Sequence, residues 1–155
     1  MSEKPQNLTI QERAKISAAK MMESDFVFQN LGAHLESINP DKATVSLKID
    51  RKHLNGHGFC HGGVIFTLAD TTFGLACNSS NVKSVAQHCT ITFIAPIREG
   101  DHLTCEAKII KKFRRSAIYD VTICNRADDI VGLFRGHSKQ VGGNIFDEAS
   151  IVKHV

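Results

Sequence analysis

One stretch of mostly apolar and small residues, residues 64–77, constrains the fold of this chain more than any other segment. It follows two glycines, Gly62 and Gly63, and it would be apolar or small on almost every side of a helix, which is typical of a buried helix. A single carboxylate, Asp70, interrupts it. Because burying an unpaired charge costs several kcal/mol, a lone acid in a core helix indicates a functional group.

The glycine pair gives this helix an N-terminus that can serve as a second functional group. The first N–H groups of a helix lack intrahelical partners and carry the positive end of its dipole, so they can stabilise a carbonyl oxygen that becomes an oxyanion. Gly62 and Asp70 lie roughly 12 Å apart along one helix axis, which is too far for both to act on one carbonyl. Two antiparallel copies about a twofold axis would bring Asp70 of one chain near Gly62 of the other. We therefore expect a dimer.

The rest of the chain predicts an antiparallel sheet around that helix. Thr9 and Glu12 form a capping box that predicts a helix to about Glu23, and residues 26–35 predict a second short helical or irregular piece with Gly32 as its cap. Alternation of apolar and polar residues predicts five strands, at residues 43–50, 85–95, 103–113, 117–125 and 130–141. One helix between the first strand and a four-strand meander does not fit a parallel βαβ sheet, so the pattern favours an α+β fold.

Composition is consistent with one intracellular domain. With 155 residues, 42% of them hydrophobic, the chain is long enough for one core and short for two. The formal net charge of +3 is spread out, which disfavours nucleic acid as a partner. The five cysteines form no CxxC pair, as expected of reduced thiols. The start of the sequence has no apolar leader and no stretch could span a membrane, so we expect a soluble, cytoplasmic protein without a membrane partner.

The sequence HGGVIFTLADTTFGLACNS at residues 61–79, with Asn55 upstream, resembles the PaaI-like hotdog-fold acyl-CoA thioesterases of the phenylacetyl-CoA type. The similarity continues through CTITFIAP, YDV and VGLFRG and ends at the Gly142-Gly143 pair. It implies a hotdog fold, in which an antiparallel sheet wraps around one long central helix and two chains dimerise through the sheet. We divide the chain into an N-terminal, helical extension (1–23), a hotdog thioesterase domain (24–145) and a C-terminal tail (146–155).

The resemblance implies hydrolysis of acyl-CoA thioesters to a free acid and coenzyme A. The substrates it implies are phenylacetyl-CoA and hydroxyphenylacetyl-CoA, in phenylacetate degradation, with no cofactor because coenzyme A is part of the substrate. Asp70 would be the nucleophile or the general base. The Gly62 N–H and Asn55 would polarise the thioester carbonyl, and His61 would orient the loop or touch the thioester. Family members also assemble further, so we expect a homotetramer of two dimers.

Further candidates for contact with the substrate or coenzyme A are Gly63, Thr71, His88, Arg114, Arg115 and Arg135. Some resembling enzymes position water with a Ser or Thr, and the corresponding strand position falls near Ala86, which leaves Thr71 and His88 as substitutes. Arginine holds phosphates through charge-assisted hydrogen bonds, so we expect Arg135 first, and Arg114 or Arg115 second, at the phosphates of coenzyme A. The large apolar side chains near the site are expected in the core by default: Phe66, Phe73, Leu75 and Phe93.

Several alternatives stay open. His53, His57, Cys60 and His61 form a cluster that could be read as zinc ligands, but it lacks both the Glu of HExxH and a second half-site, so we expect no metal. Cys60 could be a thiol nucleophile, although its adjacency to His61 does not establish a hydrogen bond. The chain could also be a non-catalytic acyl-CoA sensor, a thioesterase for medium or long acyl chains, or an enoyl hydratase, which would need a catalytic histidine paired with an acid.

Overall fold

The computed structural model describes residues 7–151. Three α-helices lie in this part of the chain, α1 (Ile10–Ser24), α2 (Phe26–Leu31) and α3 (Gly62–Cys77). The strands are β1 (His34–Asn39), β2 (Lys42–Lys48), β3 (Val82–Phe93), β4 (His102–Phe113), β5 (Ser116–Cys124) and β6 (Ile130–Asn144). Short 3₁₀ turns span Arg51–His53 and Glu148–Ser150.

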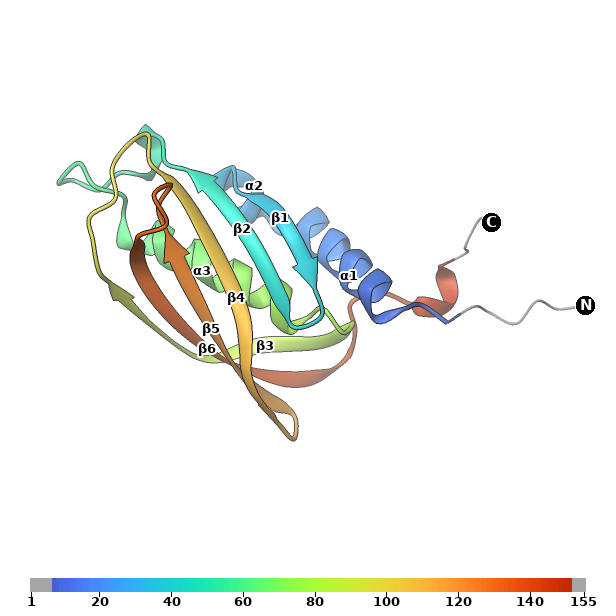
Figure 1. Ribbon diagram of the computed structural model, residues 1–155. Helices are drawn as coiled ribbons and strands as arrows, with labels where there is room; N and C mark the ends of the chain where they lie inside the picture. Colours follow the sequence, from blue (N-terminus) through green and yellow to red (C-terminus); the bar gives the residue numbers. More distant parts are fainter. Residues whose placement is uncertain (1–6, 152–155) are drawn as a thin grey trace, which may run out of the picture.

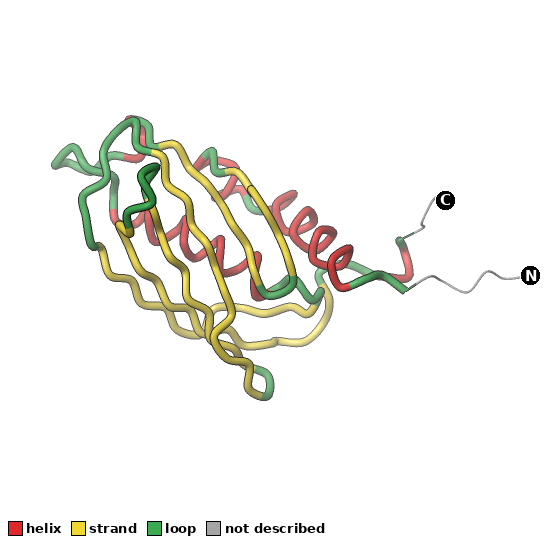
Figure 2. Tube along the Cα trace, in the orientation of Figure 1, coloured by secondary structure: helices red, strands yellow, loops and turns green. Residues whose placement is uncertain are grey.

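All neighbouring strands pair antiparallel in one six-stranded sheet with the order β1-β2-β4-β5-β6-β3. The sheet curves around α3, which lies along one of its faces, while α1 and α2 lie beside β1 (Figure 1). The strands form a single layer and the helices lie behind it (Figure 2). The predicted α+β architecture, an antiparallel sheet wrapped around one central helix, is confirmed.

The N-terminal helices begin and end where their capping residues predict. The Thr9 hydroxyl accepts a hydrogen bond from the Glu12 N–H and the Glu12 carboxylate accepts one from the Thr9 N–H, which confirms the capping box. Gly32 ends α2 in the left-handed region at φ 76°, a conformation that costs glycine little. These caps depend on neighbouring residues only, which is why the sequence predicts them.

The prediction of five strands was wrong, because β1 is a sixth strand that begins in the last two residues of the predicted second helical piece and continues to Asn39. That helix ends at Leu31, and the chain turns into β1 at His34. β1 is a short edge strand with a register shift between Leu35 and Ser37, and Ile38 is its only buried residue. A clean alternation of apolar and polar residues is therefore absent from its sequence.

The core lies between α3 and the inward-facing residues of the central strands. Every second side chain of β2, of β5 and of the first half of β4 is buried in this core, among them Val45, Cys105 and Val121. The ring of Phe73 packs so closely on β6 that a Cβ at Gly136 would lie 2.8 Å from it. The expectation of burial on all sides of α3 was wrong, since one stripe of the helix is only partly covered in the protomer: Gly63, Thr67, Asp70, Thr71 and Gly74.

The edge strand β3 borders this open stripe. It spans 12 residues, pairs only with β6 among the described strands, and most of its residues are exposed. Phe93, which we expected in the core, is 51% exposed at the end of this strand. The reason is its position, because none of the described strands lies beyond β3 to cover its side chains.

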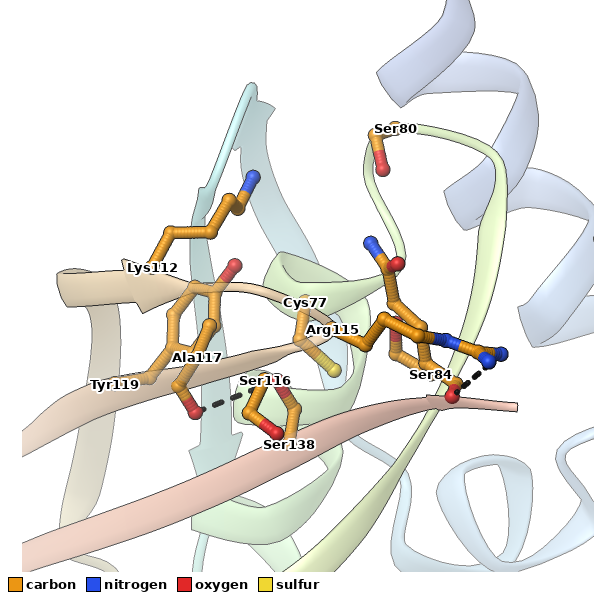
Figure 3. Close-up of a pocket in the computed structure, with 10 residues that line it drawn as sticks. Cys77, Ser80, Ser84, Lys112, Arg115, Ser116, Ala117, Tyr119 and Ser138 are labelled. Atoms are coloured by element: carbon orange, nitrogen blue, oxygen red, sulfur yellow. Dashed lines mark hydrogen bonds between the residues drawn. The ribbon is translucent and has the colours of Figure 1, made fainter. Parts of the chain in front are cut away.

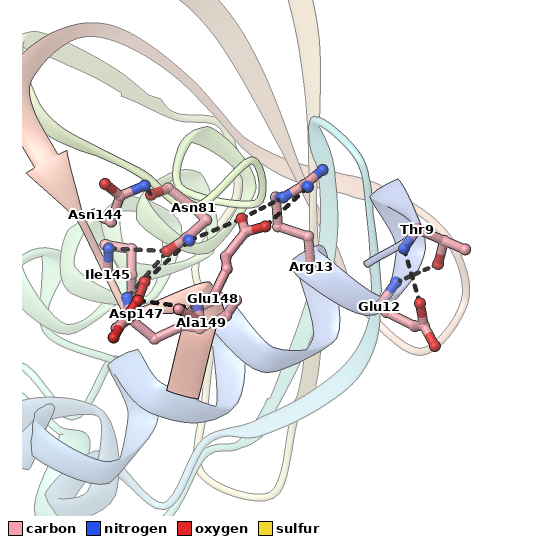
Figure 4. A network of polar contacts seen from close by, with 10 residues as sticks. Thr9, Glu12, Arg13, Asn81, Asn144, Ile145, Asp147, Glu148 and Ala149 are labelled. Atoms are coloured by element: carbon pink, nitrogen blue, oxygen red, sulfur yellow. Dashed lines mark hydrogen bonds and ion pairs between the residues drawn. The ribbon is translucent and has the colours of Figure 1, made fainter. Parts of the chain in front are cut away.

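The segment after β6 folds back and joins α1 to the turn that follows α3. Asn81 is fully buried at φ 66°. Its side-chain oxygen accepts hydrogen bonds from the N–H groups of Ile145 (2.9 Å) and Phe146 (3.0 Å), and its Nδ2 donates to the Phe146 carbonyl (3.1 Å) and to Glu148 (3.0 Å). Glu148 forms a two-bond ion pair with Arg13 of α1, at 2.6 and 3.1 Å (Figure 4). We call this set the Asn81 clasp.

The predicted tail therefore begins with residues that pack on the domain. The first six residues of the predicted extension and the last four of the tail lie outside the described residues. Within residues 7–151, no helix is both long enough and apolar enough to cross a membrane.

Candidate active site

The N-terminus of α3 leaves one backbone donor without an acceptor. His61 is the N-cap, and its carbonyl oxygen accepts hydrogen bonds from Val64 and Ile65. The Gly63 N–H donates to Nδ1 of His61 at 2.9 Å. Among residues 7–151, no acceptor for the Gly62 N–H is present. The helix dipole therefore acts through one free N–H, and His61 has a structural contact of the kind we considered for it.

Asn55 lies in the loop that leads into this helix end. Its side-chain oxygen accepts hydrogen bonds from the N–H groups of His57 (2.9 Å) and Phe59 (3.2 Å). These bonds fix which way the amide points, because the oxygen is used inside the loop. Its Nδ2 has no acceptor in the described part of the chain. Asn55 and Gly62 thus each present a free N–H donor on the same loop-to-helix junction.

Asp70 lies in the open stripe of α3, half-buried. Burial raises the pKa of its carboxyl group, a hydrogen bond from the thiol of Cys89 lowers that pKa, and the charge of Asp25 raises it. Cys89 lies on β3, with its Sγ 3.8 Å from Oδ1 of Asp70. Asp25 caps α2 through the Phe28 N–H. Sequence reasoning missed both neighbours, although the alternation along β3 places residues 89, 91 and 93 on one face.

An open, mostly apolar groove of about 340 Å³ lies beside Gly62. Its walls include Phe59, Ile65 and Phe93, and the ring of Phe93 covers Gly62 so closely that a Cβ there would lie 3.0 Å from the ring. The Arg98 guanidinium lies 4.6 Å from the centre of the Phe59 ring. The groove offers an apolar surface next to the free N–H.

The histidine and cysteine cluster has structural contacts of its own. His53 is buried, Nδ1 accepts from the Asp50 N–H at 3.0 Å, and Nε2 lies 3.0 Å from the Leu31 carbonyl oxygen, so backbone groups occupy both ring nitrogens. The Cys60 thiol lies 3.8 Å from the His61 carbonyl oxygen, and burial raises its pKa to about 11. A thiol that stays protonated is a poor nucleophile, and His61 Nδ1, already bonded to Gly63, is not available to activate it.

Two residues that we predicted to contact the substrate or coenzyme A, Arg135 and His88, lie on the outer face of the sheet, away from α3. Arg135 forms a two-bond ion pair with Asp120, at 2.6 and 2.8 Å. His88 is a direct strand partner of His137, and their rings lie 5.5 Å apart. Cys89 and Gly136, the next pair, face α3 instead, because side chains alternate across a sheet. Within one protomer the fold therefore does not bring Arg135 or His88 to Asp70.

The other predicted residues lie closer to α3. Thr71 follows Asp70, and its hydroxyl has no hydrogen-bond partner among residues 7–151. Arg114 and Arg115 form the turn of the β4–β5 hairpin. Figure 3 shows Lys112 and Arg115 around a small polar pocket with Cys77, the last residue of α3. The basic hairpin therefore lies at the opposite end of α3 from Gly62.

The chemistry available to this arrangement is that of acyl transfer. Two N–H donors can bind a carbonyl oxygen, and a half-buried carboxylate with a raised pKa can act as a base or nucleophile. In one protomer the Gly62 N–H and the Asp70 carboxylate are eight residues apart on the same helix, which is about two turns.

Comparisons with known proteins agree with this class of site. The model of the thioesterase superfamily matches residues 57–131. Acyl-coenzyme A thioesterase PaaI of Escherichia coli is 41% identical over 133 residues, covering 86% of this chain and 95% of the relative. A solved structure of E. coli PaaI, described as a protein of the phenylacetic acid degradation operon, superposes with a TM-score of 0.85 at 38% identity, covering 88% of this chain and 99% of that one. A Streptococcus mutans protein bound to acetyl-CoA superposes with a TM-score of 0.70 at 27% identity, covering 72% and 90%.

The chain belongs to the thioesterase superfamily and has its hotdog fold. Within that superfamily it is a PaaI-like acyl-CoA thioesterase. The resemblance identified from the HGG and LAD residues is thus confirmed.

Proposed function

We propose that this enzyme hydrolyses aryl-acyl-CoA thioesters, with Asp70 as the catalytic carboxylate and Gly62 and Asn55 as the donors to the thioester carbonyl. The observation that carries the proposal is the pair of unused N–H donors at the start of α3 and in the loop before it, because the N–H groups of His61, Gly63 and Val64 around Gly62 all have acceptors. Donors that are aimed before the substrate arrives stabilise an oxyanion without reorganisation.

The proposed site is shared between two copies of the chain. β3 is a free edge strand, and the open stripe of α3 runs beside it. A twofold axis at this edge would pair β3 with its copy and place the two α3 helices antiparallel, with Asp70 of one protomer near Gly62 of the other. Light scattering should give the mass of a dimer or a multiple of it; a fully active monomer would contradict the shared site. Assembly of two dimers into a tetramer stays a prediction.

Two reaction routes fit these groups. As a nucleophile, Asp70 attacks the thioester carbon, the C–S bond breaks, coenzyme A leaves as the thiolate, and water then hydrolyses the mixed anhydride. As a general base, Asp70 takes a proton from the attacking water, and the same C–S bond breaks as the tetrahedral intermediate collapses. In both routes Asp70 must be ionised. Activity should therefore fall as the pH drops below the pKa of Asp70, which burial raises.

The aryl preference is tested by thiol release from a panel of esters. We expect phenylacetyl-CoA and hydroxyphenylacetyl-CoA to have a kcat/KM at least tenfold above those of acetyl-CoA and of palmitoyl-CoA, because one methylene-sized misfit in an apolar pocket already costs about tenfold. The E. coli relative and its operon support this class. If activity were highest with a medium-chain or long-chain acyl-CoA, the proposed aryl preference would be wrong, while the proposed hydrolysis of acyl-CoA would stand. Absence of thiol release from every ester of the panel would contradict the proposed hydrolysis.

Coenzyme A phosphates are proposed to contact Arg114 and Arg115. In an antiparallel pair the basic hairpin of one protomer lies at the same end as Gly62 of the other. The double substitution Arg114→Gln and Arg115→Gln should raise KM for phenylacetyl-CoA by roughly tenfold, since two charge-assisted contacts of about 0.7 kcal/mol each are lost. Arg135→Gln is the matched control, because that guanidinium is paired with Asp120.

The effect of the double substitution should disappear with phenylacetyl-pantetheine, which lacks the nucleotide phosphates. An equal rise in KM for both substrates would show that the hairpin acts on the fold of the site and not on phosphate. A rise in KM only in the Arg135→Gln variant would indicate that Arg135, on the outer face of the sheet, contacts the coenzyme A phosphates. In the cell we propose that the enzyme acts in phenylacetate degradation in the cytoplasm.

A further inference from the structure

Cys89 is the side chain of β3 that contacts the proposed catalytic carboxylate. Its Sγ lies 3.8 Å from Oδ1 of Asp70, within the range of a hydrogen bond from sulfur. Cys89 pairs with Gly136 of β6, whose position faces α3, so the thiol points from the edge strand toward the open stripe of the helix. The other oxygen of Asp70, Oδ2, has no hydrogen-bond partner within residues 7–151.

The thiol can donate to Asp70 but is poorly suited to nucleophilic attack. Burial and the charge of Asp70 together raise the pKa of Cys89 to about 11, so it keeps its proton at neutral pH. Two other titratable groups interact with this carboxylate: Asp25 at the start of α2, and Cys77 on α3 itself, whose pKa burial and then Asp70 raise to about 12. Neither is a donor to Asp70, so Cys89 is its one hydrogen-bond donor in the described part of the chain.

We propose that Cys89 is a positioning residue for Asp70, whose thiol holds Oδ1 and leaves Oδ2 directed to the thioester or to the attacking water. The inference rests on the proposed role of Asp70. A carboxylate anchored through one oxygen keeps one orientation along the reaction, which is the advantage of a supporting contact around a catalytic group. The same hydrogen bond stabilises the ionised carboxylate and so opposes the effect of burial on its pKa.

The test compares Cys89→Ala, Cys89→Ser and Cys89→Val by their pH profiles of kcat/KM for phenylacetyl-CoA. The acidic limb of the pH profile is the pH range in which kcat/KM falls as Asp70 becomes protonated. Loss of the donor in the Ala and Val variants should shift this limb to higher pH by about half a unit, because the ionised carboxylate loses a stabilising hydrogen bond. Their kcat should fall several-fold while KM stays within about twofold. Serine keeps a donor and should retain the wild-type limb. Valine keeps apolar bulk, so its agreement with alanine excludes a packing effect.

Cys124→Ala is the matched control, because the pKa of this half-buried thiol at the end of β5 is raised by burial and by the charges of Asp128, Glu106 and Asp129, and not by Asp70. The acidic limb of the pH profile of this variant should coincide with that of the wild type. An unchanged limb in both Cys89→Ala and Cys89→Val, or an equal shift in Cys89→Ser, would overturn the positioning role. Full activity of Asp70→Asn on the same substrate would instead overturn the proposed function, so the two failures are distinguishable.

Discussion

Asp70→Asn should lower kcat for phenylacetyl-CoA hydrolysis by about a hundredfold or more, as the loss of a catalytic group does. Asparagine keeps the size and one oxygen of the side chain but can neither attack the thioester nor take a proton. Because Asp70 is half-buried and burial raises its pKa, removing its charge should not destabilise the protein. KM should stay nearly constant, and the measurement is steady-state thiol release at saturating substrate.

The control for this prediction is Glu23→Gln, which removes an exposed carboxylate of α1 whose one ion pair within residues 7–151 is with Lys20. That variant should keep wild-type kcat. Equal kcat in Asp70→Asn and the wild type, with both proteins folded by circular dichroism, would exclude both the nucleophilic and the general-base route. Accumulation of an acyl-enzyme bond in rapid-quench experiments would separate the two routes in the wild type.

Asn81→Ala should have the largest effect on stability, about 3–4 kcal/mol in the free energy of unfolding. The substitution removes four side-chain hydrogen bonds at a fully buried position and leaves the Phe146 N–H without its acceptor, while the Ile145 N–H keeps only the Asn81 carbonyl oxygen at 3.3 Å. Each buried group left unsatisfied costs about 1–3 kcal/mol. It also puts alanine at φ 66°, which asparagine tolerates better. Urea denaturation measures the change, and Tm should fall by roughly 10 °C.

Two variants divide this effect into its causes. Asn81→Gly relieves the positive φ but not the lost hydrogen bonds, so it should be more stable than Asn81→Ala by about 1 kcal/mol. Asn144→Ala removes one hydrogen bond from an exposed side chain to the Asn81 carbonyl and should cost less than about 1 kcal/mol. If Asn81→Gly matched the wild type, the backbone and not the clasp would explain the position.

The parts of the fold that the sequence predicts are those set by local patterns. The Thr9 capping box, the Gly32 cap and the long helix at residues 62–77 follow from neighbouring residues. β1 was missed because an edge strand buries little and needs no strict alternation. The burial expected for Phe93 failed for a related reason, since β3 has no outer neighbour in the protomer.

In the candidate site, too, the sequence predicts the contacts between neighbouring residues and misses those that depend on how the strands pair. Gly62, His61 and Asn55 are close in sequence, and their hydrogen bonds run within one loop and helix end. The contact between Cys89 and Asp70 joins residues 19 apart on different elements, and its existence depends on the register of β3. Arg135 carries the right charge, but the strand pairing gives it Asp120 as a partner on the outer face. Charge and residue type do not determine to which side of a sheet a residue points.

The Asn81 clasp has a consequence for the order of events on the ribosome. The ion pair between Arg13 and Glu148 joins residues 135 positions apart, so nearly the whole chain must be synthesised before α1 receives its final contact. At about 5–20 residues per second, Glu148 is added roughly 6–25 seconds after α1 has been synthesised. The packing of α1 on β1 and α3 needs only residues that are synthesised much earlier. The clasp is thus a late step, which ties the N-terminal helix to the end of the sheet after its other contacts can already have formed.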